Sequence, residues 1–408
     1  MRILHTADWH LGKRLMDYSR LPEQHEVMAE ICEVADREEV DAVIVAGDLF
    51  DTYNPGNEAM ELLYRTLKRL SREGQRPVIA IAGNHDSADR IEAPDPLARE
   101  CGILFAGYPG SHIPAFTLDT GLEVSHSEPG FVEVRVPGIG YPMRLLLTPY
   151  ANEVTMRRYL GEEDREEALR QVLAERWQHL ADRYCDDLGV NMLTAHLYVM
   201  KKGGAEPEEP DDEKPILHMG GAQAIYTENF PKNMQYVALG HLHRYQTVDK
   251  EPCPVVYSSS PLSYSFSEAG QQKYVAIIDV EPGKEAEVRR VALEKGRKLI
   301  RKRFESTEEA VEWLTANEQT FVELTLVTET YLAAKTKKQL YNVHDGIVSL
   351  IPEVTGEQDP MQARGKVMPD MNRDIRDLFK SYFEHKKGQE PNEDLMQLFN
   401  EILEAQRS

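Results

Sequence analysis

The chain has 408 residues, 41% of them hydrophobic and 28% charged, which is typical of a globular protein with two or three domains. Its 47 basic and 69 acidic side chains give a formal net charge of −22, which argues against holding nucleic acid through overall positive charge. The four cysteines form no CxxC pair, MRILHTADWH is too polar for a signal peptide, and no apolar run could span a bilayer, so we expect free thiols and a cytoplasmic protein.

Strands and helices alternate in the first part of the chain. We predict strands at 2–6, 41–48 and 77–83, and helices at 22–37 and about 57–72. The second and third strands, DAVIVAGD and PVIAIAG, are almost continuously apolar. Such strands are typical of a parallel sheet covered on both faces, so the fold class is α/β.

The middle of the chain adds shorter strands and charged segments. Short strands are expected at about 103–148, a helix-rich stretch at about 152–188, and buried strands at 190–199 and 236–240. Residues 201–215, KKGGAEPEEPDDEKP, are dense in glycine, proline and acid, which predicts a mobile loop.

The sequence changes in character at residue 286. EVRRVAL, RKLIRKRFE, FVELTLVT and GIVSLIP are expected to be strands, and Ser306-x-x-Glu309 is a capping box that opens a helix. We therefore predict a main domain, a small α/β domain, a linker and a C-terminal helical segment, at residues 1–285, 286–354, 355–372 and 373–408.

Two amphipathic helices are predicted in tandem in the C-terminal segment. Their apolar residues recur with helical spacing and are Ile375, Leu378, Phe379, Tyr382 and Phe383, then Leu395, Leu398, Phe399, Ile402 and Leu403. Such helices can pack on their own protein or lie in the groove of a partner, and the linker before them favours the partner.

Residues of metal-ligand type follow five of the predicted strands. They are Asp8 and His10; Asp48; Asn84 and His85; His196; and His241 and His243. The carboxyl ends of parallel strands meet at one edge of a sheet, so we expect these side chains to converge. Gly47, Gly83 and Gly240 precede them, and a glycine lets the backbone turn sharply and approach an ion closely.

The convergent set contains three oxygen donors and four imidazoles besides His85. Seven donors exceed the needs of one divalent ion but suit two ions that share a bridging carboxylate, and mixed nitrogen and oxygen ligands favour Mn²⁺, Fe²⁺ or Zn²⁺ over Ca²⁺. Two ions about 4 Å apart can activate a water molecule and stabilise both oxygens of an in-line phosphoryl displacement. His85 is left to meet the phosphate charge or to protonate the leaving oxygen.

Each motif alone has an ordinary explanation. A lone Asp-x-His is usually a turn, AGD and GNHD can simply end strands, and His196 alone is more often a core histidine than a ligand. The order of all five motifs, each at a strand end, is what makes the pattern specific.

The five motifs resemble those of the calcineurin-like metallophosphoesterases. HTADWHLGK, AGDLFDTYNP, AGNHDSADR, YVALGHLHRYQ and SPLSYSFSE are similar to the SbcD family, the nuclease subunits of bacterial SbcCD complexes, and the resemblance runs from residue 1 to about 280 and resumes in the C-terminal helices. It implies a two-sheet metallophosphoesterase sandwich with a small α/β capping domain and C-terminal amphipathic helices that dock an ATPase.

The resemblance also implies roles for the residues. One metal ion would be held by Asp8, His10, Asp48 and His243, and a second by Asp48, Asn84, His196 and His241. His85 would be the catalytic histidine that binds no metal. The family prefers manganese, with magnesium or iron as alternatives, and acts as a 3′-to-5′ exonuclease on duplex ends and an endonuclease on single strands and hairpins. Its members are homodimers that assemble with SbcC, an SMC-like ATPase, in DNA repair.

Two departures from the family pattern are visible. The family commonly has Tyr-x-Gly-Ser-Pro where this chain has Ser259 in place of the glycine, so the turn there is expected to differ. The acidic loop at 206–213 is unusual and is expected to limit how DNA approaches.

Residues 289–303 carry eight basic side chains against Glu294 alone, a local charge of +7. The candidates for contact with the phosphate backbone are Arg289, Arg290, Arg297, Lys298, Arg301 and Arg303. A solvated strand face explains any one of them equally well. The chain has no G-x-x-x-x-G-K-[ST], so any ATP dependence must come from a partner.

The sequence thus predicts a two-metal DNA nuclease. One alternative is a phosphoesterase that acts on small phosphodiesters or phosphoproteins, which would leave the basic stretch and the tandem helices without a purpose. Another is an architectural subunit that tethers DNA ends, against which the complete ligand set and His85 argue.

Overall fold

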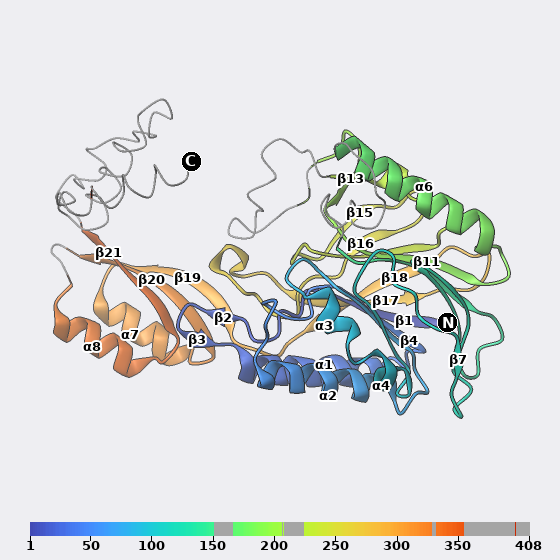
Figure 1. The fold of residues 1–408 in the computed structure, drawn as a ribbon. Coiled ribbons are helices and arrows are strands. Elements are labelled where there is room, and N and C mark those ends of the chain that lie inside the picture. Colours follow the sequence, from blue (N-terminus) through green and yellow to red (C-terminus); the bar gives the residue numbers. More distant parts are fainter. Residues whose placement is uncertain (151–165, 206, 208–223, 329–331, 355–395, 397–408) are drawn as a thin grey trace. The chain divides into compact units, whose positions relative to one another are not determined.

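The computed structural model describes residues 1–150, 166–205, 207, 224–328, 332–354 and 396. Two β-sheets face each other, and helices cover their outer faces (Figure 1). Met1–Leu326 and Ala334–Ile351 form one compact unit. Apart from Met396, the predicted linker and tandem helices lie outside the described residues. No helix among the described residues is long and apolar enough to cross a membrane.

The first sheet has six strands in the order β18-β17-β1-β4-β5-β6. β1, β4, β5 and β6 are parallel, whereas β17 is antiparallel to β1 and β18 to β17. The strands are β1 (Arg2–Thr6), β4 (Ala42–Ala46), β5 (Val78–Ile81), β6 (Ile103–Ala106), β17 (Lys273–Asp279) and β18 (Glu287–Leu293). The helices between them are α1 (Leu21–Arg37), α2 (Asn57–Ser71), α3 (Ala88–Glu92) and α4 (Asp95–Arg99). β1, β4 and β5 lie within two residues of their predicted bounds.

The second sheet has eight strands in the order β15-β16-β14-β11-β10-β9-β8-β7. Its central strands β10, β11, β14 and β16 are parallel. The strands are β7 (Phe116–Thr117), β8 (Glu123–Glu128), β9 (Phe131–Arg135), β10 (Met143–Thr148), β11 (Val190–His196), β14 (Tyr236–Gly240), β15 (Gln246–Asp249) and β16 (Val255–Tyr257). Helix α6 (Glu166–Tyr184) covers the outer face of this sheet.

Three apolar cores hold these layers together, because successive side chains of a strand point to opposite faces. On β1, Leu4 joins the core under α1 and α2, whereas Ile3 faces the second sheet. On β10, Leu145 faces the first sheet, and Leu146 packs with Trp177 of α6. Burial on both faces explains why the strand sequences are almost continuously apolar. The predicted two-sheet α/β sandwich is confirmed.

A third sheet of three strands, β19-β20-β21, forms the small α/β region. Its elements are β19 (Lys298–Phe304), α7 (Thr307–Ala316), β20 (Thr320–Thr328), α8 (Ala334–Val343) and β21 (Ile347–Val354). The predicted cap is present at the start of α7, where Ser306 Oγ accepts a hydrogen bond of 3.2 Å from the backbone N–H of Glu309.

One strand differs from its predicted place. EVRRVAL was expected to open the small domain at residue 286, but it is β18 and pairs with β17 at the edge of the first sheet. A tight turn, in which Lys284 N–H donates to the carbonyl of Glu281 at 3.1 Å, joins the two strands as an antiparallel hairpin. The separate three-stranded sheet therefore begins with β19.

Short elements complete the described chain. They are the strand pairs β2 (Arg14–Leu15) with β3 (Tyr18–Ser19) and β12 (Val199–Met200) with β13 (Ile225–Tyr226), and the 3₁₀ helices η1 (Thr227–Asn229) and η2 (Phe266–Glu268). All four cysteines are free, as the sequence predicted.

Candidate metal centre

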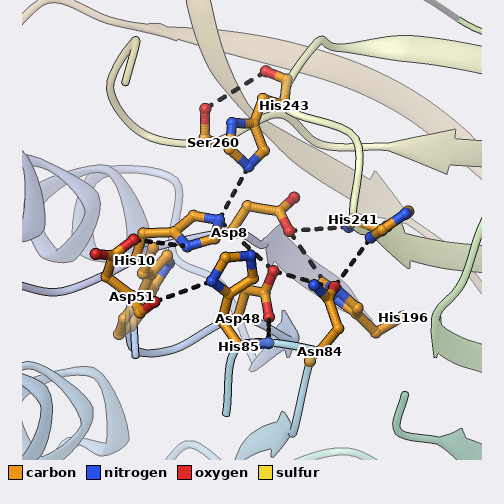
Figure 2. A network of polar contacts seen from close by, with 12 residues as sticks. Asp8, His10, Asp48, Asp51, Asn84, His85, His196, His241, His243 and Ser260 are labelled. Atoms are coloured by element: carbon orange, nitrogen blue, oxygen red, sulfur yellow. Dashed lines mark hydrogen bonds and ion pairs between the residues drawn. The ribbon is translucent and has the colours of Figure 1, made fainter. Parts of the chain in front are cut away.

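The loops that follow β1, β4, β5, β11 and β14 meet at one end of the two facing sheets (Figure 2). These loops and the last residue of β11, His196, supply all eight residues selected from the sequence; the other seven are Asp8, His10, Asp48, Asn84, His85, His241 and His243. Three groups have ligand-type atoms within 4.8 Å of one another, namely Asp8 with His10 and His243, Asp8 with Asp48 and His196, and His10 with Asp51 and His85. Two sheets and five loops thus supply one compact cluster.

The backbone at the strand ends is held in an uncommon conformation. Asp8, His10 and Asp48 have φ values of +55°, +44° and +50°, in the left-handed region. Asp8 N–H donates to the carbonyl of Gly47 at 3.0 Å, and His10 N–H donates to the carbonyl of Asp48 at 2.9 Å. Such conformations persist only where the surroundings enforce them, and they gather at functional sites.

Two glycines make the close approach of these loops feasible. A Cβ added to Gly47, whose φ is +95°, would lie 2.2 Å from Nδ1 of His196. A Cβ added to Gly83 would lie 2.1 Å from Oδ1 of Asp48. Any side chain at either position would therefore displace a residue of the cluster.

On one side of the cluster, two imidazoles face each other. Nε2 of His10 and Nε2 of His243 are 2.9 Å apart, and Oδ2 of Asp48 lies 3.6 Å from Nε2 of His10. Among the described residues, Oδ2 of Asp8 and Nδ1 of His10 are buried without a hydrogen-bond partner. Buried polar groups are normally satisfied, so these atoms fit a site that a cation completes.

The other side of the cluster brings acceptor atoms together. Nδ1 of His196 donates to the carbonyl of Ala46 at 2.9 Å, which leaves the lone pair of the neutral ring at Nε2. That Nε2 lies 2.9 Å from Oδ1 of Asn84 and 3.3 Å from Oδ2 of Asp48. Nδ1 of His241 lies 3.1 Å from the same Asn84 oxygen. Acceptors that point at one another in this way suit a divalent cation.

The electrostatics of the cluster also call for positive charge. Burial raises the pKa of Asp8 to about 6. Burial alone would also raise the pKa of Asp48, but the adjacent His196 brings it well below its usual value. Burial lowers the pKa of His196, but the charge and hydrogen bond of Asp48 oppose this, and the net pKa is raised to about 9. A cation bound beside Asp8 and Asp48 would therefore be stabilised by these buried carboxylates.

His85 lies beside the cluster and is half-buried. Its Nδ1 donates to the carbonyl of Asp51 at 2.9 Å, and its ring is 4.8 Å from that of His10. The same Asp51 accepts a hydrogen bond of 3.0 Å from Nζ of Lys13. The ring is therefore held through Nδ1.

Asp86 is a residue whose role the sequence did not reveal. Its carboxylate accepts hydrogen bonds from the backbone N–H groups of Leu49, Phe50 and Gly83, at 3.0, 2.9 and 2.8 Å. Burial, together with the charge of Asp48, raises the pKa of Asp86 to about 6. Asp86 therefore joins the loop after β4 to the loop after β5. Its place in GNHD was the only sequence signal.

Further supports come from outside the motifs. Gln24 of α1 donates to the carbonyl of His10 at 2.8 Å and accepts from the N–H of Gly12 at 2.9 Å, so it fixes the loop after β1. Tyr264 donates to the carbonyl of Trp9. No local pattern distinguishes Gln24 from any other helical glutamine, whereas Tyr264 lies within the SPLSYSFSE motif.

Comparison with known proteins agrees with this geometry. A family model described as calcineurin-like phosphoesterase matches residues 1–245. The chain is 36% identical over 410 residues to the SbcD subunit of the nuclease SbcCD from Bacillus subtilis, covering 98% of this chain and 97% of that protein. The chain belongs to the SbcD family of calcineurin-like phosphoesterases. SbcD-family proteins of the same name from Rhodobacter capsulatus and Staphylococcus epidermidis are 36% and 29% identical over 290 and 286 residues. These alignments cover 69% of this chain in both cases, and 67% and 66% of the relatives.

This SbcD-family chain is thus a metal-dependent phosphoesterase from a family of nuclease subunits. Its departure from the family pattern at Ser259 has a structural explanation. Ser259 is buried and has a φ of +77°, the conformation that the family's glycine would favour. Its Oγ accepts a hydrogen bond of 3.1 Å from the N–H of Tyr274 on β17. The serine therefore keeps the glycine-type turn and adds a contact to the first sheet.

The predicted DNA-contacting residues of this SbcD-family chain lie on two different sheets. Arg289 and Arg290 are on β18, Arg297 directly precedes β19, and Lys298, Arg301 and Arg303 are on β19. Four of the six have ion-pair partners, which are Glu38 for Arg289, Asp345 for Arg297, Glu323 for Arg301 and Glu305 for Arg303. The acidic loop at 206–213 lies outside the described residues except for Pro207.

Proposed function

We propose that this chain is a two-metal DNA nuclease that acts as a 3′-to-5′ exonuclease on duplex ends and as an endonuclease on single strands and hairpins. One observation carries the proposal, namely the convergence of seven buried or half-buried donors from five strand ends, among which Oδ2 of Asp8 has no hydrogen-bond partner in the described part of the chain. Such a cluster is too polar for a core and has the donor types of a Mn²⁺ or Fe²⁺ site.

The proposed ligand sets follow the two sides of the cluster. Asp8, His10, Asp48 and His243 would hold one ion, and Asp48, Asn84, His196 and His241 the other, with Asp48 shared. When bound, the two ions would activate a water molecule and stabilise the charge that develops on the phosphate. Manganese is the proposed metal, with magnesium or iron as alternatives.

His85 would handle the proton and the charge of the reacting phosphate. Because Asp51 fixes Nδ1, the ring presents Nε2 to the substrate, where it can bind a phosphate oxygen or protonate the leaving oxygen. Lys13, held by Asp51 at 3.0 Å, adds a positive charge near the same place.

We further propose that the chain works with other molecules in DNA break repair, recombination and replication in the cytoplasm. The parts would be a nuclease domain that ends with β18, a capping domain that begins with β19 and ends at residue 354, a linker at 355–372, and helices at 373–408 that dock an SMC-like ATPase. The chain would form a homodimer. The SbcCD name that its relatives carry supports the ATPase partner, and the exposed basic residues of β18 and β19 support contact with DNA.

Cleavage of a labelled duplex tests this proposal. Purified full-length protein with Mn²⁺ should shorten the labelled strand of a 5′-labelled duplex, and His85→Ala should abolish cleavage while leaving bound Mn²⁺ near the wild-type amount. The same assay with bis-p-nitrophenyl phosphate distinguishes the alternative. If the wild type cleaves that small ester but never DNA, with or without the ATPase, the enzyme is a small-molecule phosphodiesterase. If His85→Ala cleaves DNA as well as the wild type, His85 is not catalytic.

A further inference from the structure

A buried ion pair lies behind His243, on the side away from His10. The carboxylate of Glu268, at the end of η2, and the ammonium of Lys273, at the start of β17, are 0% and 5% exposed and contact each other directly. Neither residue belongs to the proposed ligand sets. Burying two charges costs more than packing two apolar side chains of the same size, so the pair calls for an explanation other than stability.

The contacts of the pair join His243 to the segment that follows β16. Lys273 Nζ donates to the carbonyl of His243 at 2.8 Å and to Oγ of Ser260 at 3.0 Å. Oε1 of Glu268 accepts a hydrogen bond of 3.0 Å from the N–H of Tyr264 and lies 3.5 Å from Nδ1 of His243. The lysine thus holds the backbone of His243, and the glutamate faces its ring.

Glu268 faces Lys273 through one carboxylate oxygen and His243 through the other. A carboxylate that accepts a hydrogen bond from Nδ1–H leaves the lone pair of a neutral imidazole at Nε2. Nε2 of His243 is the nitrogen that faces His10 across 2.9 Å.

We propose that Glu268 is a positioning residue that fixes the tautomer and orientation of His243 for metal binding, and that Lys273 keeps Glu268 and the His243 backbone in place. This inference rests on the proposed function, in which His243 is a metal ligand. Carboxylates that accept from the second nitrogen of a ligating histidine raise its basicity and fix its ring, and their loss typically weakens metal binding by about 10- to 100-fold.

The turn that carries Glu268 is braced by the small sheet. Gly270 N–H donates to the carbonyl of Leu299 on β19 at 3.1 Å, and Phe266 of η2 shares an apolar cluster with Leu299 and Phe321. Glu268 is therefore fixed from two directions, by Lys273 of the first sheet and by β19 of the small sheet. The position of His243 depends on both.

Calorimetric titration of the full-length, metal-free protein with Mn²⁺ tests the assignment. We expect two ions per wild-type chain, and in Glu268→Ala one of the two affinities should fall by about 10- to 100-fold while the other changes little. Glu268→Gln should lose less, because its amide oxygen can still accept from Nδ1–H. Asp249→Asn is the matched control, since Asp249 is also largely buried and paired with a lysine, Lys201 at 2.9 Å, but its second oxygen accepts from Thr227 rather than from a histidine of the cluster.

A second variant covers the case in which Glu268→Ala does not fold because Lys273 is left as an unpaired buried charge. Glu268→Met with Lys273→Met removes both charges and the acceptor for Nδ1–H while keeping side chains of similar size, and it should show the same selective loss of one ion, which restoring both native residues reverses. If the folded variants bind both ions with wild-type affinity, Glu268 is merely structural and the inference is overturned. If the wild type itself binds fewer than two ions, the proposed function fails instead.

Discussion

The metal centre and the basic stretch at 289–303 are both rich in polar residues. They differ in burial and in whether the polar side chains have hydrogen-bond or ion-pair partners. At the metal centre, Asp8 and His10 are fully buried, and each has an atom without a hydrogen-bond partner among the described residues. On β18 and β19 the arginines are exposed, and most of them already contact a carboxylate. Buried polar groups without a hydrogen-bond partner indicate a ligand site. Ion pairs on the surface contribute little to stability, so their side chains can exchange partners.

This difference predicts that the two regions respond very differently to substitution. The largest effect is expected for Asp48→Ala, because Asp48 is the carboxylate shared by both proposed ligand sets and contacts His10 and His196. Mn²⁺-dependent cleavage should fall by roughly a thousandfold or more. Asp249→Asn, another low-exposure carboxylate, should cleave at the wild-type rate; comparable loss in both variants would mean that burial, not metal binding, explains the effect.

The second-largest effect is expected for Gly83→Ala, because the added Cβ would lie 2.1 Å from Oδ1 of Asp48. We expect destabilisation by about 1–3 kcal/mol, measured by urea unfolding, together with weaker Mn²⁺ binding. Gly140→Ala is the control, since an added Cβ there meets nothing within 4 Å. A Gly83→Ala protein with normal metal affinity would show that the loops can separate without cost.

The location of the metal centre could be predicted from the sequence, whereas the position of the basic strand β18 could not. The apolar runs located β1, β4 and β5 almost to the residue, and the polar residues after them were correctly expected to converge, because the carboxyl ends of parallel strands must meet. By contrast, β18 was assigned to the wrong sheet, since a strand's local pattern does not say which neighbour it will pair with.

The supports of the centre could not be predicted for the same reason. Gln24, Asp86 and Glu268 act through contacts with loops that are distant in sequence. Asp86 lies in GNHD and Glu268 in SPLSYSFSE, but neither motif indicates which loop the side chain will contact. The charge count at 289–303 was correct, but the acidic partners, such as Glu38 and Glu323, come from other elements. Contacts between residues that are distant in the sequence could not be predicted from the sequence alone.

The basic stretch should give effects of moderate size. Arg301→Ala should weaken DNA binding only a few-fold and lower the salt dependence by about one phosphate contact, without changing bound Mn²⁺. Glu323→Gln should strengthen DNA binding and increase its salt dependence, because it frees Arg301 from its 2.7 Å ion pair. Fluorescence anisotropy over a salt series measures both, and identical salt slopes in wild type and Arg301→Ala would remove Arg301 from the DNA surface.

The smallest effect is expected for Ser259→Gly. Relief of the left-handed φ of +77° favours the variant by about 1–2 kcal/mol, while loss of the hydrogen bond to Tyr274 opposes it by about 1 kcal/mol. Stability in urea should therefore change by about 1 kcal/mol or less. A larger loss would mean that the serine hydroxyl has a greater structural role than its contacts indicate.

The most direct test of the account is the number of metal ions that the wild-type chain binds. Calorimetric titration of the metal-free protein with Mn²⁺, checked by elemental analysis after gel filtration, should give two ions per chain and none of comparable affinity in Asp48→Ala. One ion per chain, or unchanged binding in Asp48→Ala, would contradict a two-metal centre bridged by Asp48.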